Sequence, residues 1–115
     1  MKEQIIDVLR PLGLTERYRG YPILIEAVNQ TITNGKSKFP LVQNLYSSIA
    51  EEYGFPVHCV ERNIRTLAHR AWKVNPGYLQ ELAGYPLKGP PTVSEFIDIL
   101  ASHVLRQRLV GYDVK

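Results

Sequence analysis

The sequence predicts an all-α fold of about six helices, with a helix-turn-helix over residues 40–73 at its centre. Apolar residues recur at intervals of three and four along most of the chain. Proline and glycine separate these periodic segments, and no segment alternates as a strand does. The 115 residues fit one domain with one hydrophobic core, so we expect a single helical domain over residues 1–115.

The first two helices are delimited by proline and glycine. The first is expected over residues 3–12, where Pro11 and Gly13 help to end it. The second should begin near Pro22, because proline suits the first turn of a helix. The Asn-Gly dipeptide at 34–35 is a strong turn signal and closes this second segment.

The next two helices are expected to lie on either side of a very short break. The third should begin near Pro40, and Gly54 supplies the conformation that commonly stops a helix. Only two residues follow before periodicity resumes at Val57, so the two helices must turn sharply against each other, as in a helix-turn-helix. The apolar stripe of the third helix consists of Leu41, Leu45, Ile49 and Tyr53.

The C-terminal part predicts two further helices. The fourth helix continues to about residue 73, and a short fifth is expected over residues 78–83, closed by Gly84. The last helix opens with a capping box, in which Thr92 caps the start of the helix and Glu95 reaches back. Its buried stripe should be Phe96, Ile97, Leu100, Val104 and Leu105.

The fourth helix carries the charge that distinguishes this chain. Residues 57–73 hold four arginines and lysines against one glutamate, which equals the net charge of +3, so the other residues balance to zero. With 100° of rotation per residue, its apolar residues share one sector and its polar residues share the opposite one. The apolar sector contains Val57, Val60, Ile64, Leu67, Ala68 and Ala71. The polar sector contains His58, Arg62, Arg65, His69 and Lys73.

Such a polar sector suits the major groove of double-stranded DNA. Arg62 and Arg65 lie in the first half of the helix, where recognition helices contact bases, and a guanidinium bonds both acceptors of guanine. Glu61 can accept a hydrogen bond from a cytosine amino group. Arg70 and Lys73 lie later and are expected at phosphates. The alternative is an ordinary charged surface helix, in which Glu61 and Arg65 form an i,i+4 pair.

The cysteine, the histidines and the larger aromatic residues give little indication of catalysis or metal binding. His58 and Cys59 point about 100° apart on a helix and have no third orienting group, so we expect no enzyme activity. An exposed Cys59 could act as a redox-sensing thiol, although a plain cysteine is the default. The three histidines lack partners at metal-ligand spacing, so no metal or cofactor is expected. Trp72 is expected in the core, as is Tyr46 with a polar tip; a phosphate contact by Tyr46 is the alternative.

The expected cellular compartment follows from the lack of a disulfide and of long apolar segments in the sequence. A single cysteine forms no internal disulfide, which suits a reducing cytoplasm. No apolar run approaches the roughly 20 residues that span a bilayer, and the N-terminus lacks the apolar stretch of a signal peptide. We therefore expect a cytoplasmic protein with no membrane partner.

Several short stretches, in a fixed order from about residue 15 to residue 108, resemble a known family. They are Gly20-Tyr21 with Leu24 and Glu26-Ala27, Leu45-Tyr46 with Ile49-Ala50, Val60-Glu61-Arg62 through Ile64-Arg65 to Ala71-Trp72, Gly84-Tyr85, and Pro91-Thr92 with Ser94-Glu95-Phe96-Ile97. The family is the C-terminal effector domain of stage zero sporulation protein A, the response regulator of endospore formation. The resemblance implies a six-helix effector domain, winged-helix-like but without a wing sheet.

The resemblance also implies a function. It implies a transcription regulator related to sporulation initiation that binds short promoter boxes, often in tandem pairs, through residues 57–72. A sigma subunit of RNA polymerase is a further expected partner. Base contacts are expected from Glu61, Arg62, Arg65, Cys59 and Thr66. Backbone contacts are expected from His58, His69, Arg70, Lys73 and Lys38.

The chain departs from the family in several respects. The family typically has arginine where this chain has Cys59 and histidine where it has Thr66, so the preferred box is expected to differ. The loop over residues 85–91 is shorter. Family members also carry a receiver domain, for which this chain has no room. The alternative function is therefore a protein-interaction module that modulates a full-length homologue without binding DNA; an exposed apolar patch on the last helix would favour it.

Overall fold

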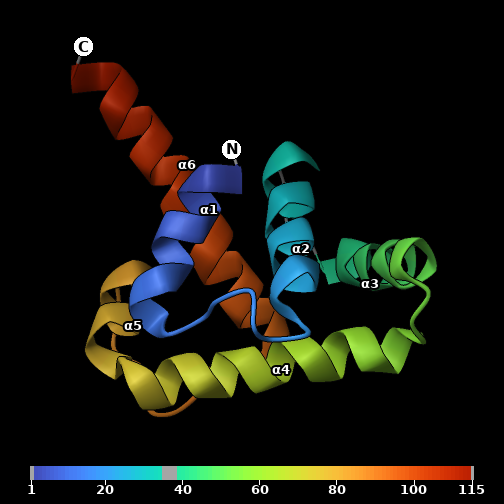
Figure 1. Ribbon diagram of the computed structural model, residues 1–115. Coiled ribbons are helices and arrows are strands. Elements are labelled where there is room, and N and C mark those ends of the chain that lie inside the picture. The colour runs from blue at the N-terminus through green and yellow to red at the C-terminus, as the bar shows by residue number, and fades with distance from the viewer. Residues whose placement is uncertain (1, 35–38, 115) are drawn as a thin grey trace.

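Helices account for all the regular structure in the computed structural model, which describes the backbone of residues 2–34 and 39–114 and the side chains of 2–33 and 45–108. The elements are α1 (Lys2–Leu9), the 3-10 helix η1 (Arg10–Leu12), α2 (Tyr21–Asn34), α3 (Phe39–Tyr53), α4 (Val57–Val74), α5 (Pro76–Ala83) and α6 (Val93–Val114). No strand occurs among the described residues, which confirms the all-α fold of about six helices (Figure 1).

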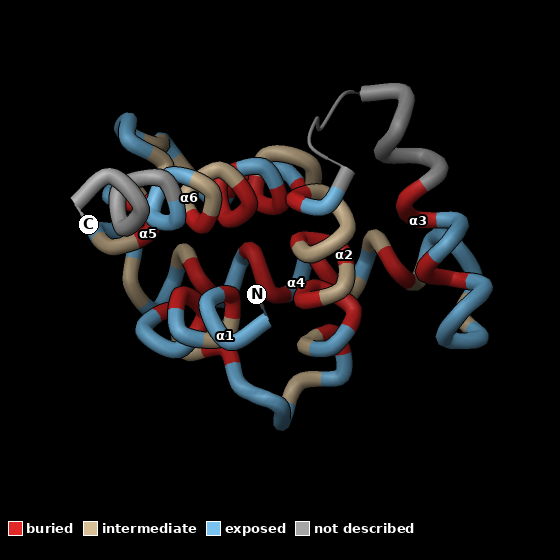
Figure 2. The backbone as a smooth tube through the Cα atoms, turned by 90° about the horizontal axis from the view of Figure 1, so that it is seen from above, coloured by how far each residue is buried: buried red, intermediate tan, exposed pale blue. Residues whose placement is uncertain are grey.

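The core lies between α4 and the helices that stand on it. In Figure 1, α4 runs along the lower side of the molecule, and α1, α2 and α6 rise from it. Helix α2 packs along α6, and α4 packs against η1, α2, α3, α5 and α6. Figure 2 shows the buried positions turned toward the space that these helices enclose. The largest fully buried side chains come from each of these elements, and they include Phe96, Ile5, Leu12, Ile23, Leu24, Ile64 and Leu79.

The helix-turn-helix is present as the sequence predicts. Gly54 has a φ of +74°, a left-handed conformation that ends α3, and the amide of Phe55 donates to the carbonyl of Ala50 at 2.9 Å. Pro56 is extended, with a ψ of 151°, and α4 begins immediately after it. Helix α3 then packs across the N-terminal half of α4, as Figure 1 shows.

Some predicted boundaries and burials were wrong. The first helix does not stay α-helical to residue 12, because its last turn, which contains Pro11, is a 3-10 turn. Tyr53 and Val57 were placed in apolar stripes, but they are 38% and 40% exposed. Both lie where the chain leaves one helix and enters the next, beyond the reach of the packed core.

The capping box of α6 is only half formed. The amide of Glu95 donates to Thr92 Oγ1 at 3.2 Å, as predicted. The carboxylate of Glu95 does not reach back, because it accepts a hydrogen bond of 2.9 Å from the Tyr85 hydroxyl instead. The loop before α6 is therefore tied to the first turn of that helix. None of the helices in the described part of the chain is both long and apolar enough to span a membrane.

Candidate nucleic-acid interface

Helix α4 has one buried face and one exposed face. The buried face consists of Val60, Ile64, Leu67, Ala68 and Ala71, which are at most 1% exposed. These residues recur at the spacing that places them on one side of a helix. Their burial fixes the rotation of α4, so the opposite side must point away from the protein.

The exposed face brings together most of the residues that the sequence predicts at DNA. The exposed residues are His58, Arg62, Arg65, Thr66, His69, Arg70 and Lys73. Arg62 and Arg65 lie three residues apart and therefore occupy neighbouring turns of the same face. Arg62 makes no ion pair with any residue that the structure describes. Neither arginine folds into the interior, so both can be reached by a partner.

An ion pair on this face orients Arg65. Its guanidinium Nη2 lies 2.7 Å from Glu61 Oε1, and the two side chains are 50% and 42% exposed. Such an exposed i,i+4 pair adds little to stability, about 0.3–0.5 kcal/mol. Its effect is geometric, because it places an acceptor and a donor side by side on the surface that faces outward.

The two positions that depart from the family pattern differ in accessibility. Thr66 is exposed, but its hydroxyl donates to the carbonyl of Arg62 at 3.1 Å, so its proton is used within the helix. Cys59 is half-buried and is a free thiol. Its carbonyl accepts a hydrogen bond of 2.8 Å from Asn63 Nδ2. Both residues therefore border the Arg62 surface without extending far from it.

Tyr46 supports this surface from α3. Its side chain belongs to the core and is only 8% exposed, which confirms the expected core position. Burial, and after it the carboxylate of Glu61, raise the pKa of the Tyr46 hydroxyl to about 12, and Arg65 opposes the change. The phenol is therefore neutral at physiological pH and lies in the electric field of the Glu61–Arg65 pair.

On the side of α4 away from Tyr46, the connection between η1 and α2 packs along the helix. A Cβ added at Gly20 would lie 3.0 Å from both the carbonyl oxygen and the Cβ of Asn63, and one added at Gly13 would lie 3.1 Å from Val74 Cγ1. Residues 13 to 20 therefore run alongside α4 (Figure 1). Arg17 and Arg19 in this connection are exposed. The sequence alone does not single out these two arginines, because nothing in the local pattern places them beside the fourth helix.

The remaining predicted residues are accounted for as follows. Lys38 lies outside the described residues. Trp72 is half-buried and packs against the core. No cluster of three histidine, cysteine, aspartate or glutamate residues suited to a metal ion occurs in the described part of the chain. Large exposed apolar side chains are Tyr53, Val57, Val74 and Tyr85, none of them on the described portion of α6, so nothing described there favours the interaction-module alternative.

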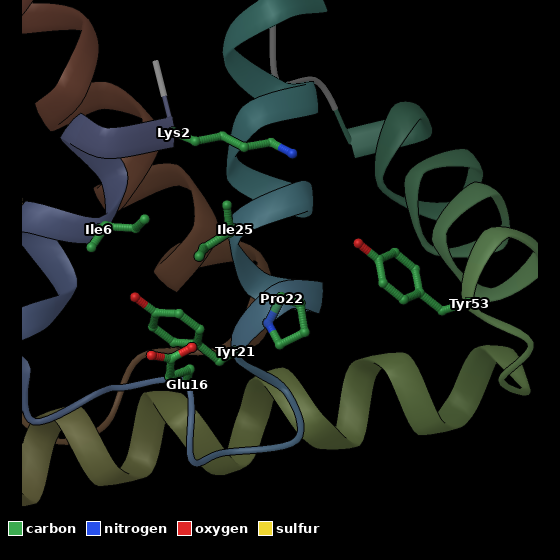
Figure 3. A pocket seen from close by; sticks show the side chains of 7 residues that line it. All are labelled: Lys2, Ile6, Glu16, Tyr21, Pro22, Ile25 and Tyr53. Atoms are coloured by element: carbon green, nitrogen blue, oxygen red, sulfur yellow. The ribbon is translucent and has the colours of Figure 1, made fainter.

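An open pocket lies on a different side of the molecule from this face. It has a volume of about 420 Å³ and lies between α1, α2 and the end of α3, above α4 in Figure 3. The Lys2 ammonium, on its rim, lies 3.8 Å from a carboxylate oxygen of Glu26. The pocket wall consists of Lys2, Ile6, Glu16, Tyr21, Pro22, Ile25 and Tyr53. None of the residues predicted at DNA lines it.

Comparison with known families gives one match. Residues 5–104 match the family described as sporulation initiation factor Spo0A C terminal. No curated protein and no solved structure matches significantly. The matched range extends from Ile5 in α1 to Val104 in α6, so it includes the whole helix-turn-helix.

Proposed function

The chain belongs to the sporulation initiation factor Spo0A C-terminal family, whose members are DNA-binding effector domains that regulate transcription, and we propose that it binds a short promoter box directly through the exposed face of α4. One observation carries the proposal. Arg62 and Arg65 stand side by side on the outside of a helix whose opposite face is buried in the core. An α-helix about 10–12 Å wide fits the major groove of B-DNA, which is about 12 Å wide.

The proposed base contacts follow from the chemistry of this face. Arg62 has no competing ion pair among the described residues, so its guanidinium is available for the O6 and N7 acceptors of a guanine. The ion pair with Glu61 holds the side chain of Arg65 in place, and the other N–H donors of the same guanidinium are left for a base. Glu61 would then accept from a cytosine amino group next to the base bound by Arg65.

The surrounding residues are proposed to set the register and refine the choice of box. His58, His69, Arg70 and Lys73 are exposed around the arginine pair and are suited to phosphates. Cys59 and Thr66 present a thiol and a methyl group with an engaged hydroxyl, instead of the longer cations typical of the family. Because they offer fewer donors to bases, we expect a box that differs from the usual family box at the positions they face.

The test is a selection of bound duplexes from a random pool, followed by titrations of the selected box. We expect one recurrent box. Arg62→Ala and Arg65→Ala should each weaken binding to that box by about 1–3 kcal/mol and relax the sequence preference at one base pair. Fluorescence anisotropy with the box and with a scrambled duplex measures both effects.

Lys73→Ala serves as the matched control, because it removes one charge from the same helix. It should weaken binding to the box and to the scrambled duplex alike, and flatten the salt dependence by about one unit. If the wild-type protein binds the selected box no better than a scrambled duplex, direct sequence recognition is excluded.

Two further parts of the proposal rest on the family alone. Two copies are proposed to bind tandem boxes, and a sigma subunit of RNA polymerase is the proposed protein partner. A duplex with two boxes at varied spacing tests the first. Second-copy binding that is independent of spacing would remove the case for pairing.

A further inference from the structure

The connection between η1 and α2 forms a second basic element next to α4. It touches α4 at two points, Gly20 against Asn63 and Gly13 against Val74. Arg70 lies on the same edge, because Asn63, Arg70 and Val74 fall within about 40° of one another around the helix. We call this row of three residues the loop edge of α4.

The loop edge has a defined position relative to DNA in the proposed complex. A helix about 10–12 Å wide nearly fills a groove about 12 Å wide, so the two sugar-phosphate backbones that bound the groove run near its two sides. Whatever packs against a side of the helix then lies next to a backbone. On the loop edge, that element is the connection over residues 13–20.

The charges of this connection suit phosphate. Arg17 and Arg19 are exposed, and neither makes an ion pair with a residue that the structure describes. Glu16, the neighbouring acid, lines the pocket beside Tyr21 (Figure 3). Burial raises the pKa of the Tyr21 hydroxyl, and the charge of Glu16 raises it to a lesser extent, so Glu16 acts on that side. The two arginines therefore lie on a segment that packs against the same edge of α4 on which Arg70 lies.

The backbone of the connection is held in place rather than left as a free loop. The amide of Tyr18 donates to the carbonyl of Thr15 at 3.1 Å, and the amide of Tyr21 donates to the carbonyl of Tyr18 at 3.0 Å. Tyr18 itself is half-buried and packs against the core. Because Tyr18 is anchored, the arginines on either side of it have fixed attachment points and lose less entropy on binding.

We propose that Arg17 and Arg19 bind phosphates of the DNA strand that runs along the loop edge of α4. This connection would then act as an additional backbone contact in a fold whose described residues form no wing sheet. The proposal rests on the DNA-binding mode proposed above. It adds a phosphate-binding element that contributes affinity without sequence preference, because phosphates are the same in every sequence.

The experiment measures affinity for the selected box and for a scrambled duplex over a range of salt concentrations. Arg17→Ala and Arg19→Ala should each reduce the steepness of log K against log salt by about 0.9, the value for one phosphate. They should weaken both duplexes by the same factor. Arg17→Lys and Arg19→Lys should keep the wild-type slope, because a phosphate contact needs the charge, whereas a purely structural role would not be restored in this way.

Lys2→Ala is the matched control for loss of one positive charge. Lys2 lies on α1, pairs with Glu26, and is remote from α4 (Figure 3). It should leave the slope unchanged. A second measurement replaces single phosphates of the box by uncharged methylphosphonates. One or two of these should weaken wild-type binding but have no effect on the Arg17→Ala, Arg19→Ala double variant.

The outcomes separate this inference from the proposed function. If Arg62→Ala relaxes specificity while the Arg17 and Arg19 variants behave as Lys2→Ala does, the inference is wrong and the proposed function stands. If the variants change specificity between the two duplexes, phosphate binding is likewise wrong. If wild-type protein binds no duplex, both proposals fail.

Discussion

Gly20 shows at the scale of a single residue how the start of α2 comes to lie against α4. An ideal Cβ at this position would be 3.0 Å from the backbone oxygen and the Cβ of Asn63, tighter than most real Cβ contacts. The residue is buried, and no flexible side chain can move aside. The absence of one carbon therefore allows the close approach that positions the connection carrying Arg17 and Arg19.

Gly20→Ala should consequently destabilise the protein. Forcing a methyl group into this contact should cost about 1–3 kcal/mol of unfolding free energy, as overpacking usually does. Gly77→Ala is the matched control, because no heavy atom lies within 4 Å of a Cβ added there and Gly77 lies within α5. It should stabilise by up to about 1 kcal/mol. Urea unfolding measures both, and equal stability of the two variants would contradict the argument.

His103 gives the molecule a pH-dependent stability. Its pKa lies below the ordinary value of 6.5, first because burial disfavours the charged imidazolium and second because Arg106 repels it. In the unfolded state the imidazole recovers its ordinary pKa, so the unfolded state binds more protons as the pH falls below about 6.5. Stability is therefore complete above that pH and decreases as the pH falls through the folded-state pKa.

The measurement compares melting temperatures of the wild type and His103→Gln between about pH 7.5 and about pH 5.5. Carboxylates titrate in both proteins alike, so the difference between them isolates His103. On acidification, the melting temperature of the wild type should fall further than that of the variant. Parallel curves for the two proteins would show that His103 titrates alike in the folded and unfolded states.

At the scale of the elements, Asn75 joins three of them. Its side-chain oxygen accepts a hydrogen bond of 3.2 Å from the Tyr78 amide and so caps α5. Its side-chain nitrogen donates to the carbonyl of Pro11 in η1 at 3.2 Å. One residue therefore fixes the turn from α4 into α5 and ties both to the end of the first helical segment.

Substitutions at Asn75 should separate these two contributions. Asn75→Asp retains the capping oxygen but loses the donor to Pro11, so it should cost about 1 kcal/mol or less, given the exposure of that bond. Asn75→Ala loses both hydrogen bonds and should lower the unfolding free energy by about 1–2 kcal/mol, in line with the loss of a cap. Thermal unfolding ranks the three proteins. An alanine variant as stable as the aspartate variant would show that the cap contributes nothing.

The elements were largely predictable from sequence because their signals are local. Gly54 ends α3 and Gly84 ends α5, both with positive φ, as their positions after periodic segments predict. The exposed face of α4 follows from the buried one. Contacts between distant segments were not predictable. The bond from Tyr85 that draws Glu95 out of the capping box depends on how a loop folds back, and the position of Arg17 beside α4 depends on the packing of Gly20.

At the scale of the whole molecule, one long helix carries the exposed basic face and the other helices hold it. Figure 1 shows α4 along one side with α1, α2 and α6 above it, so the proposed binding face lies on the opposite side of α4 from these helices. The family match spans all these elements except the first residues of α1 and the end of α6. Binding of DNA through the proposed face would therefore leave the other sides available for protein contacts.

The distribution of apolar surface predicts that the free protein is a monomer. The large apolar side chains that are exposed in the described part of the chain are scattered. Tyr53 ends α3, Val57 and Val74 are the two ends of α4, and Tyr85 lies in the loop after α5. They do not form the large apolar patch that a permanent dimer buries, about 2,000 Å² or more. Light scattering should give a mass near 13.1 kDa without DNA. On a duplex with two boxes, the complex should contain two copies of the chain. A mass of twice the chain in the absence of DNA would show that two copies associate before they bind DNA. The interface between them would then involve side chains other than those described.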